Sequence, residues 1–472
     1  MINFNFLSFF FRCIVYSELK NLIEILKFLK STLNFYNIIK LIIFFFNRDV
    51  NPYKSNQLNE LLKINRKYWI NKKKFKNTEK ILVECFINQQ LANMSNMFLS
   101  KYLEKILNNK TVAVIRKNDF KSEVILRSFN IKKIYKYKFG GFIERIRYIF
   151  LASKLISKFK NTKDLYNLKV DDIDVGLTTY DTWIRYSRIP TSENININMV
   201  YILANALHAK NYYERLIKNE NIKHLVQAEK QFVPLSISFQ VALKNKVKVY
   251  AKEGFNKITI RIYSNFLERN FTKIKYSYKA LNKIISILGK NKINKMTDNY
   301  YKFIKKHKLF GKNWANAVQN KSQIGLWKNK VDGDETFDKN KTKLSINALI
   351  NYDKKMISEK FGWSHKKKII TIFFPYLIDG IYQNGRRNLF IDNYKWIFNT
   401  LNEIKKIKKY NWLLREHPQE IRYKTKTNLG NILDLITEKN HHIKKTPLNI
   451  NPDSIIDLTD VAVTCNGTAA LE

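Results

Sequence analysis

The order of apolar and polar positions after about residue 55 predicts short strands that alternate with longer helices. Runs rich in β-branched and apolar residues lie at 79–87, 111–115 and 222–229, and segments with helical periodicity lie between them. Continuous apolar runs of this length are typical of parallel strands that are buried on both faces. We therefore expect an α/β domain with a parallel sheet at 79–263.

The same alternation begins again toward the carboxyl terminus. The run IITIFF within 365–380 predicts a strand, 388–409 a helix, and 410–418 a second strand. Between the two parts, residues 264–364 are rich in Lys, Asn and Tyr and are mostly helical in period, which is typical of a connecting region. The pattern predicts an α/β protein with a second domain at 365–472. Its two doubly wound, Rossmann-like domains would be joined by a helical linker.

Residues 1–55 form a strongly apolar, helical segment, but charged residues interrupt every run. No run reaches the roughly 20 residues needed to cross a bilayer. Between Leu22 and Phe46 apolar residues recur at three- and four-residue steps with lysines among them. That pattern is typical of a helix lying on an anionic membrane surface, and equally of helices packed on the first domain. The first alternative predicts a peripheral protein at the inner face of the cytoplasmic membrane.

The composition adds a strong basic charge. Lys and Arg number 85 against 39 Asp and Glu, a formal charge of +46, which favours anionic partners such as phospholipid headgroups or nucleotide phosphates. The lysines are spread along the whole chain instead of being concentrated beside stacking aromatics, so no specific nucleic acid is expected as a partner. Cys13, Cys85 and Cys465 are too few and too far apart for a disulfide framework or a zinc site, which fits a cytoplasmic location.

A first group of candidate binding residues follows the strand within 410–418. Arg415, Glu416 and His417 come at the carboxyl end of that strand, the edge where open α/β sheets bind ligands. Arg and His can both donate hydrogen bonds to a diphosphate, and Arg can do so in a bidentate manner. The alternative is an ordinary surface histidine before a turn at Pro418.

A second group follows the strand run VAVT near the end of the chain. Asn466, Gly467 and Thr468 precede the start of a helix, so backbone N–H groups and a hydroxyl would face an anion at a helix N-terminus. Glu472 lies one turn further on and could accept hydrogen bonds from ribose hydroxyls. The alternative is a plain capping turn. Because a parallel half-domain needs a further strand and helix, we expect that the carboxyl-terminal domain is truncated at Glu472.

Together these segments resemble a known family. The stretches 369–380, 392–418 and 460–472 resemble the carboxyl-terminal half of bacterial capsule-polysaccharide biosynthesis proteins, the Kdo-transferase-like and sialyltransferase-like group of GT-B glycosyltransferases. The stretches 176–186 and 222–254 resemble the amino-terminal half of that group. The resemblance implies two Rossmann-like domains, the first for the acceptor and the second for a nucleotide-sugar donor.

The resemblance also implies roles for the candidate residues. Arg415 and His417 would contact the donor phosphate, residues 466–468 would cradle it, and Glu472 would hold the ribose. Asp379, at the end of the IITIFF segment, would lie on the donor side. Pro375 departs from the polar residue that relatives often have nearby, which leaves the role of Asp379 open.

An inverting transfer needs a general base within hydrogen-bond reach of the acceptor hydroxyl. Asp181, Glu229 and Glu253 are the candidates, and Glu229 is preferred because it ends a predicted strand. Asp181 lies one helical turn from Arg185 and could simply pair with it. No metal is required, because basic side chains and a helix N-terminus can stabilise a departing phosphate.

The sequence therefore predicts a glycosyltransferase of capsular or surface polysaccharide biosynthesis, inverting and independent of metal. It would move a sugar from a CMP- or UDP-linked donor to a glycan or lipid-linked acceptor, with no other cofactor, beside other polysaccharide-synthesis enzymes. Two alternatives stay open. The first is a non-catalytic or degraded member of the same assembly, and the second is a basic nucleic-acid-binding protein.

Overall fold

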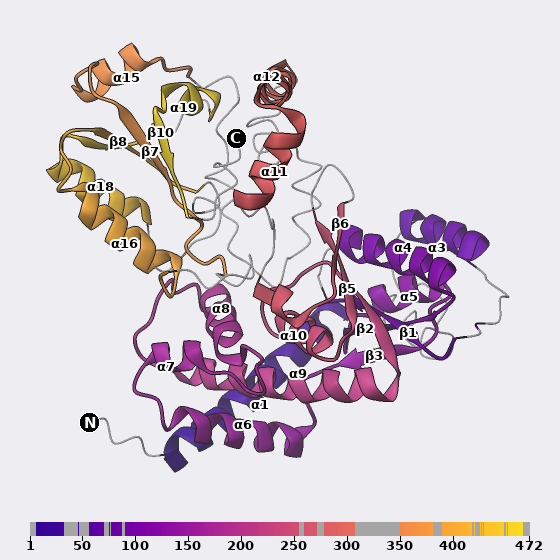
Figure 1. Ribbon diagram of the computed structural model, residues 1–472. Coiled ribbons are helices and arrows are strands. Elements are labelled where there is room, and N and C mark those ends of the chain that lie inside the picture. Colours follow the sequence, from indigo (N-terminus) through magenta and orange to yellow (C-terminus); the bar gives the residue numbers. More distant parts are fainter. Residues whose placement is uncertain are drawn as a thin grey trace. The chain divides into compact units, whose positions relative to one another are not determined.

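The computed structural model describes most of the chain outside the region between 307 and 349. The described residues are 6–32, 46, 56–69, 75, 77–86, 90–253, 259–270, 278–306, 350–380, 389–417, 420, 425, 427, 429–447, 450 and 452–465. Within them the protein is α/β, and it divides into two compact units that each contain one sheet (Figure 1).

The first unit contains a mixed sheet that is mostly parallel. Its strands are β1 (Lys80–Cys85), β2 (Lys110–Arg116), β3 (Ile134–Tyr137), β4 (Ile222–Gln227), β5 (Lys248–Glu253) and β6 (Thr259–Tyr263). Their order is β3-β2-β1-β4-β5-β6, and only β6 runs antiparallel to its neighbour. From β1 the chain continues to β2 and β3 on one side of the sheet, and from β4 it continues to β5 and β6 on the other side. The carboxyl ends of β1 and β4 therefore flank a topological switch point, where open α/β sheets bind ligands.

Helices connect and cover these strands. They are α1 (Phe6–Thr32), α3 (Asn56–Trp69), α4 (Gln90–Leu107), α5 (Phe120–Ser128), α6 (Phe142–Ile156), α7 (Thr162–Asn167), α8 (Val175–Ser187), α9 (Ile197–Asn219), α10 (Leu235–Lys244) and the 3-10 helix η1 (Phe266–Asn270). Polar caps set where several begin, because they satisfy the free N–H groups of the first turn. The side chain of Asp119 accepts from the N–H of Ser122 at 3.0 Å, and that of Asn196 from the N–H of Met199 at 3.2 Å.

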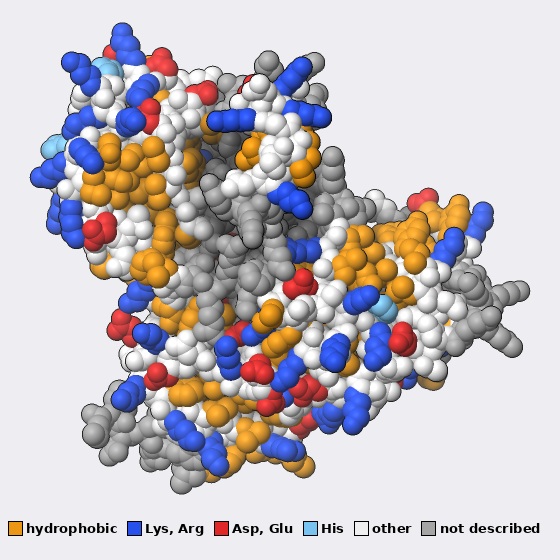
Figure 2. Space-filling view, viewed as in Figure 1, with side chains coloured by type: hydrophobic (Ala, Val, Ile, Leu, Met, Phe, Trp, Pro, Cys, Tyr) orange, Lys and Arg blue, Asp and Glu red, His pale blue; other side chains and the backbone are white. Residues whose placement is uncertain are grey.

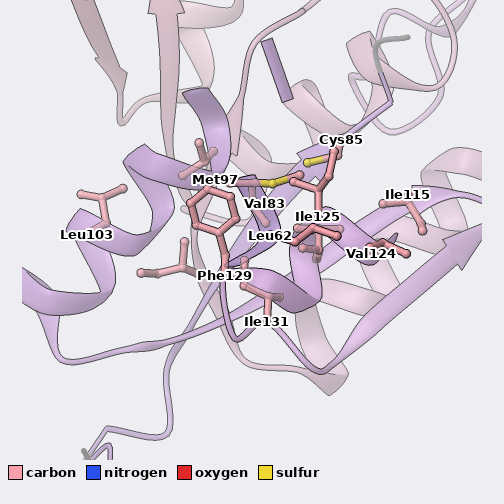
Figure 3. Packing of buried hydrophobic residues seen from close by; sticks show 14 of the residues in the cluster. Leu62, Val83, Cys85, Met97, Leu103, Ile115, Val124, Ile125, Phe129 and Ile131 are labelled. Atoms are coloured by element: carbon pink, nitrogen blue, oxygen red, sulfur yellow. The ribbon is translucent and has the colours of Figure 1, made fainter. Parts of the chain in front are cut away.

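A hydrophobic core lies between this sheet and its helices (Figure 3). Val83 and Cys85 of β1 and Ile115 of β2 are fully buried in it, together with Met97 of α4 and Phe129 at the end of α5. Strands that are buried along most of their length explain the continuous apolar runs in the sequence. The expected α/β class is confirmed for this part of the chain.

The second unit contains a parallel sheet. Its strands are β7 (Ile369–Phe373), β8 (Asn411–Arg415), β9 (Ile443–Lys445) and β10 (Val461–Val463), in the order β10-β7-β8-β9. Its helices are α11 (Tyr278–Leu288), α12 (Lys290–Lys306), α15 (Lys354–Phe361), α16 (Asn393–Ile404), α18 (Leu429–Lys439) and α19 (Pro452–Leu458). Ile369 and Leu413 of this sheet are fully buried against Ile357 of α15 and Ile455 of α19.

The amino-terminal helix α1 packs on α6 and α9 of the first unit (Figure 1). Cys13 and Ser17 are buried on its inner face. The carboxylate of Glu18 accepts from Nε and Nη2 of Arg145 at 3.1, 2.8 and 2.9 Å, a bidentate pair that fixes the helix on α6. Of the predicted amphipathic segment beyond Thr32, only Phe46 is among the described residues. Within the described part of the chain, no helix combines the length and apolarity that spanning a bilayer requires.

Candidate functional site

The candidate donor residues lie at the carboxyl edge of the second sheet. Because β7, β8 and β10 are parallel, their carboxyl ends share one edge. Arg415 is the last residue of β8, His417 follows two residues later, and Asp379 lies in the segment after β7. β10 pairs with the other side of β7, so the switch point of this sheet lies between β7 and β10.

Four residues of the predicted phosphate turn and ribose site fall outside the described part of the chain. They are Asn466, Gly467, Thr468 and Glu472. The strand that precedes them, β10, ends at Val463. β10 itself lies beside β7, on the opposite side of that strand from β8.

His417 and Arg415 are both largely enclosed. The ring of His417 lies against the ring of Tyr376, with 5.9 Å between centroids and an interplanar angle of 30°. Burial, with a smaller contribution from the charge of Arg415, lowers the pKa of His417 to about 4. The imidazole is therefore neutral at pH 7, with one N–H donor and one acceptor. Burial also lowers the pKa of Arg415, and its Nη1 donates to Oγ1 of Thr446 at 3.4 Å.

Glu420 also lies at this edge, although it was not among the residues predicted from the sequence. Its Oε1 accepts from the N–H of Leu377 at 2.6 Å, and its own N–H donates to the carbonyl of His417 at 2.9 Å. Burial raises the pKa of Glu420 to about 8, and the charges of Glu416 and Asp379 add to that effect. This carboxyl ties the segment after β8 to the segment after β7, and it is mostly protonated at neutral pH.

The segment after β7 is also held by α16. Asn393, the first residue of that helix, donates from Nδ2 to the carbonyls of Tyr376 at 2.8 Å and Asp379 at 3.3 Å. Asp392 caps the same helix by accepting from the N–H of Lys395 at 2.7 Å. The backbone at Asp379 is therefore fixed beside the carboxyl end of β7, with its side chain half-buried.

The first unit has a second polar cluster, at the switch point between β1 and β4. Glu84, on β1, is only 2% exposed. Its carboxyl group accepts from Oη of Tyr213 at 2.6 Å and Oγ of Ser238 at 3.0 Å, and from Nε2 of Gln227. Burial raises the pKa of Glu84 to about 8, although these three hydrogen bonds act in the opposite direction. The group is therefore mostly a neutral carboxylic acid at pH 7.

The three candidate bases lie on different elements of the first unit. Glu229 follows β4 and is half-buried, and its Oε1 accepts from the N–H groups of Lys230 at 2.8 Å and Gln231 at 3.0 Å. Asp181 lies within α8 and is only 1% exposed. Glu253 is the last residue of β5, and its side chain is outside the described part. Of the three, Glu229 lies at the carboxyl end of a strand that borders the switch point.

No protein-family model and no curated protein matches the chain. The functional assignment therefore depends on the residues at these two sheet edges. Among the described side chains, no group of three or more His, Cys, Asp or Glu residues is arranged to hold a metal ion.

A surface hollow of about 520 Å³ lies elsewhere on the first unit. Lys218, Lys223, Lys244 and Glu214 line it, together with Asn221 and Ile222 at the start of β4. It is therefore at the amino-terminal edge of the sheet, opposite to Glu84 and Gln227. Ligands of open α/β sheets bind at the carboxyl edge, so we do not assign this hollow to the candidate site.

Proposed function

We propose that this protein is a GT-B-like glycosyltransferase of surface polysaccharide synthesis, which uses a CMP- or UDP-linked sugar. The observation that carries the proposal is the position of Arg415 and His417 at the carboxyl end of β8, one strand from the switch point between β7 and β10. Parallel sheets bind nucleotides at such edges. The second unit would hold the donor, and the first unit would hold a glycan or lipid-linked acceptor.

The chemistry of the edge suits a nucleotide phosphate. Arg415 supplies a permanent positive charge, and neutral His417 supplies one directed N–H donor. The turn that the sequence predicts at 466–468 would add backbone N–H groups, as in other anion sites at helix N-termini. Charge that develops on the departing phosphate would be stabilised by these groups without a metal.

The acceptor side would use a carboxylate as general base. Glu229 suits this role best, because two backbone N–H groups hold its Oε1 at the carboxyl end of β4. A base fixed in this way can accept the proton of an acceptor hydroxyl as the new glycosidic bond forms. Glu229→Gln should abolish sugar transfer and leave nucleotide binding unchanged, as measured by turnover and by calorimetry of the same sample.

The donor site can be tested by thermal shift with CMP, CDP, UDP, GDP and a short DNA. One pyrimidine nucleotide should raise the melting temperature of the wild-type protein, and His417→Ala should lose that effect. The matched control is His365→Ala, because His365 is an exposed histidine just before the opposite end of β7. Stabilisation by DNA alone, or equal nucleotide effects in both variants, would contradict the proposal.

A further inference from the structure

The outward face of α1 carries a continuous row of exposed apolar side chains. The row consists of Phe11, Val15, Leu19, Leu22 and Leu26, each between 51% and 61% exposed. Successive members are three or four residues apart, so they lie on one side of the helix. At 1.5 Å per residue the row is about 22 Å long. Single exposed apolar residues are common on protein surfaces, but a row of this length is not.

The row faces outward because the opposite side of α1 is fixed. Cys13 and Ser17 are buried against the first unit on that side, and Glu18, at the edge of the row, forms its bidentate pair with Arg145 of α6. The ring of Tyr16 also packs edge-on against Tyr201 of α9, with 5.7 Å between centroids. Turning the row inward would break these contacts, so its exposure belongs to the folded protein.

Helix α6 extends the same apolar surface. Phe142, Ile143, Phe150 and Leu151 are exposed on it, and Ile143 is 81% exposed. The rings of Phe10 on α1 and Phe150 on α6 meet edge-on at 5.7 Å, so the two helices pack side by side. Figure 2 shows apolar side chains with Lys and Arg among them, and some Asp and Glu beside them, in the lower part of the view, where α6 lies in Figure 1.

The charges on these two helices are mostly positive. Arg12, Arg147 and Lys154 are exposed and lie within four residues of a member of the apolar surface. The described carboxylates of the two helices are both engaged: Glu18 pairs with Arg145, and Glu144 lies 3.5 Å from Nη2 of Arg215. The surface therefore combines apolar side chains with exposed cations.

We propose that this α1–α6 face docks on a membrane surface that contains anionic phospholipids. The apolar side chains would enter the boundary between headgroups and acyl chains, and Arg12, Arg147 and Lys154 would contact lipid phosphates. A second copy of the chain fits the face less well, because pairing two such faces would bring cations of the same sign together. The inference is independent of the donor site.

Flotation of the full chain with vesicles tests this inference. The wild-type protein should float with phosphatidylcholine vesicles that contain phosphatidylglycerol, much less with phosphatidylcholine alone, and less at high salt. The double variant Val15→Glu, Leu22→Glu should lower the bound fraction at least about tenfold, because charged side chains enter the interface poorly. The matched control is Leu435→Glu, at an apolar residue of α18 that is 61% exposed.

Circular dichroism and thermal unfolding would first establish that the double variant is folded, as expected for substitutions at half-exposed positions. Equal flotation of the double variant and the control would overturn the proposal. So would binding to neutral vesicles that salt does not weaken. A wild-type protein that ignores vesicles, but forms a dimer that the double variant loses, would assign the face to a second copy instead.

Discussion

The side-chain amide of Gln227 donates a hydrogen bond to the carboxyl group of Glu84, which joins the carboxyl ends of β4 and β1 inside the first sheet. Tyr213 of α9 and Ser238 of α10 bind the same carboxyl group. A buried acid is tolerated only where such partners satisfy it, and here they come from β4 and from two helices that pack against each other. The cluster thus fixes the position of two helices relative to these strands.

Glu84 should make the stability of the protein depend on pH. Its folded pKa of about 8 lies above the ordinary value of 4.5, so the folded protein holds a proton that the unfolded chain has lost between these values. The stabilisation is complete below pH 4.5 and is lost as the pH rises through 8. Urea unfolding across this range should show a fall of at most about 1.4 kcal/mol per pH unit.

The variant Glu84→Gln keeps the size of the side chain but cannot titrate. It should remove the part of that slope that Glu84 contributes. The part from Glu420, whose pKa is also raised to about 8, should remain. Glu403→Gln, at an exposed pair with Lys406, should leave the slope unchanged. An unchanged slope in Glu84→Gln would assign the pH dependence to another group.

Glu220 should act in the opposite direction. Burial alone would raise its pKa, but hydrogen bonds from Lys133 at 2.7 Å and Lys80 at 2.8 Å lower it to about 2. The carboxylate therefore contributes stability above pH 4.5, and that contribution is lost as the pH falls through 2. Glu220→Gln should lower the free energy of unfolding by about 1 kcal/mol at pH 6 and by much less near pH 2. A constant difference at both pH values would rule out this ion-pair effect.

Glu420 should couple nucleotide binding to pH if the donor site is where we propose it. As the pH rises through about 8, its carboxyl group loses a proton and adds a negative charge beside His417 and Arg415. Calorimetric titration should then show that the Kd for a nucleoside diphosphate rises several-fold as the pH increases. Glu420→Gln, which keeps an acceptor for the N–H of Leu377, should flatten the profile. A steeper profile in the variant would contradict the assignment.

The attachment of α1 can be followed through its cysteine. Cys13 is fully buried, and burial raises the pKa of its thiol to about 12, so it should resist thiol reagents. Arg145→Met removes the partner of Glu18 and should make Cys13 react several-fold faster. Peptide mapping after labelling identifies the site, and Cys85, buried in a core that α1 does not form, should stay unreactive. Equal labelling of both thiols would indicate general unfolding.

The strands that could be predicted from the sequence are those with a run of apolar residues. Most of these strands are buried along most of their length, and the edge strand β10 was predicted from its run VAVT although it is mostly exposed. The runs at 79–87, 111–115 and 222–229 contain β1, β2 and β4. The edge strand β3 gave no such signal, because Ile134–Tyr137 is short, alternates with lysine and is buried only at its last residue. Edge strands depend on a neighbour for their hydrogen bonds, and a local pattern of apolar residues does not reveal that neighbour.

The candidate residues at the two sheet edges also differ in how far the sequence could predict them. Arg415 and His417 could be placed at a carboxyl edge because they directly follow an apolar strand run. The role of Glu84 could not be predicted, since two of its partners lie 129 and 154 residues further along the chain. An acid inside an otherwise apolar strand was the one available signal, and it indicates a buried partner without identifying it.

The pair between Glu18 and Arg145 also has a consequence for biosynthesis. Its two residues are 127 positions apart, so α1 leaves the ribosome long before α6 exists. At usual rates of translation the interval is roughly 6–25 s. During that time the side of α1 that is buried in the folded protein is exposed as well as its outward apolar row. Until α6 is made, the apolar side chains on both sides of α1 are accessible to a chaperone or a lipid surface.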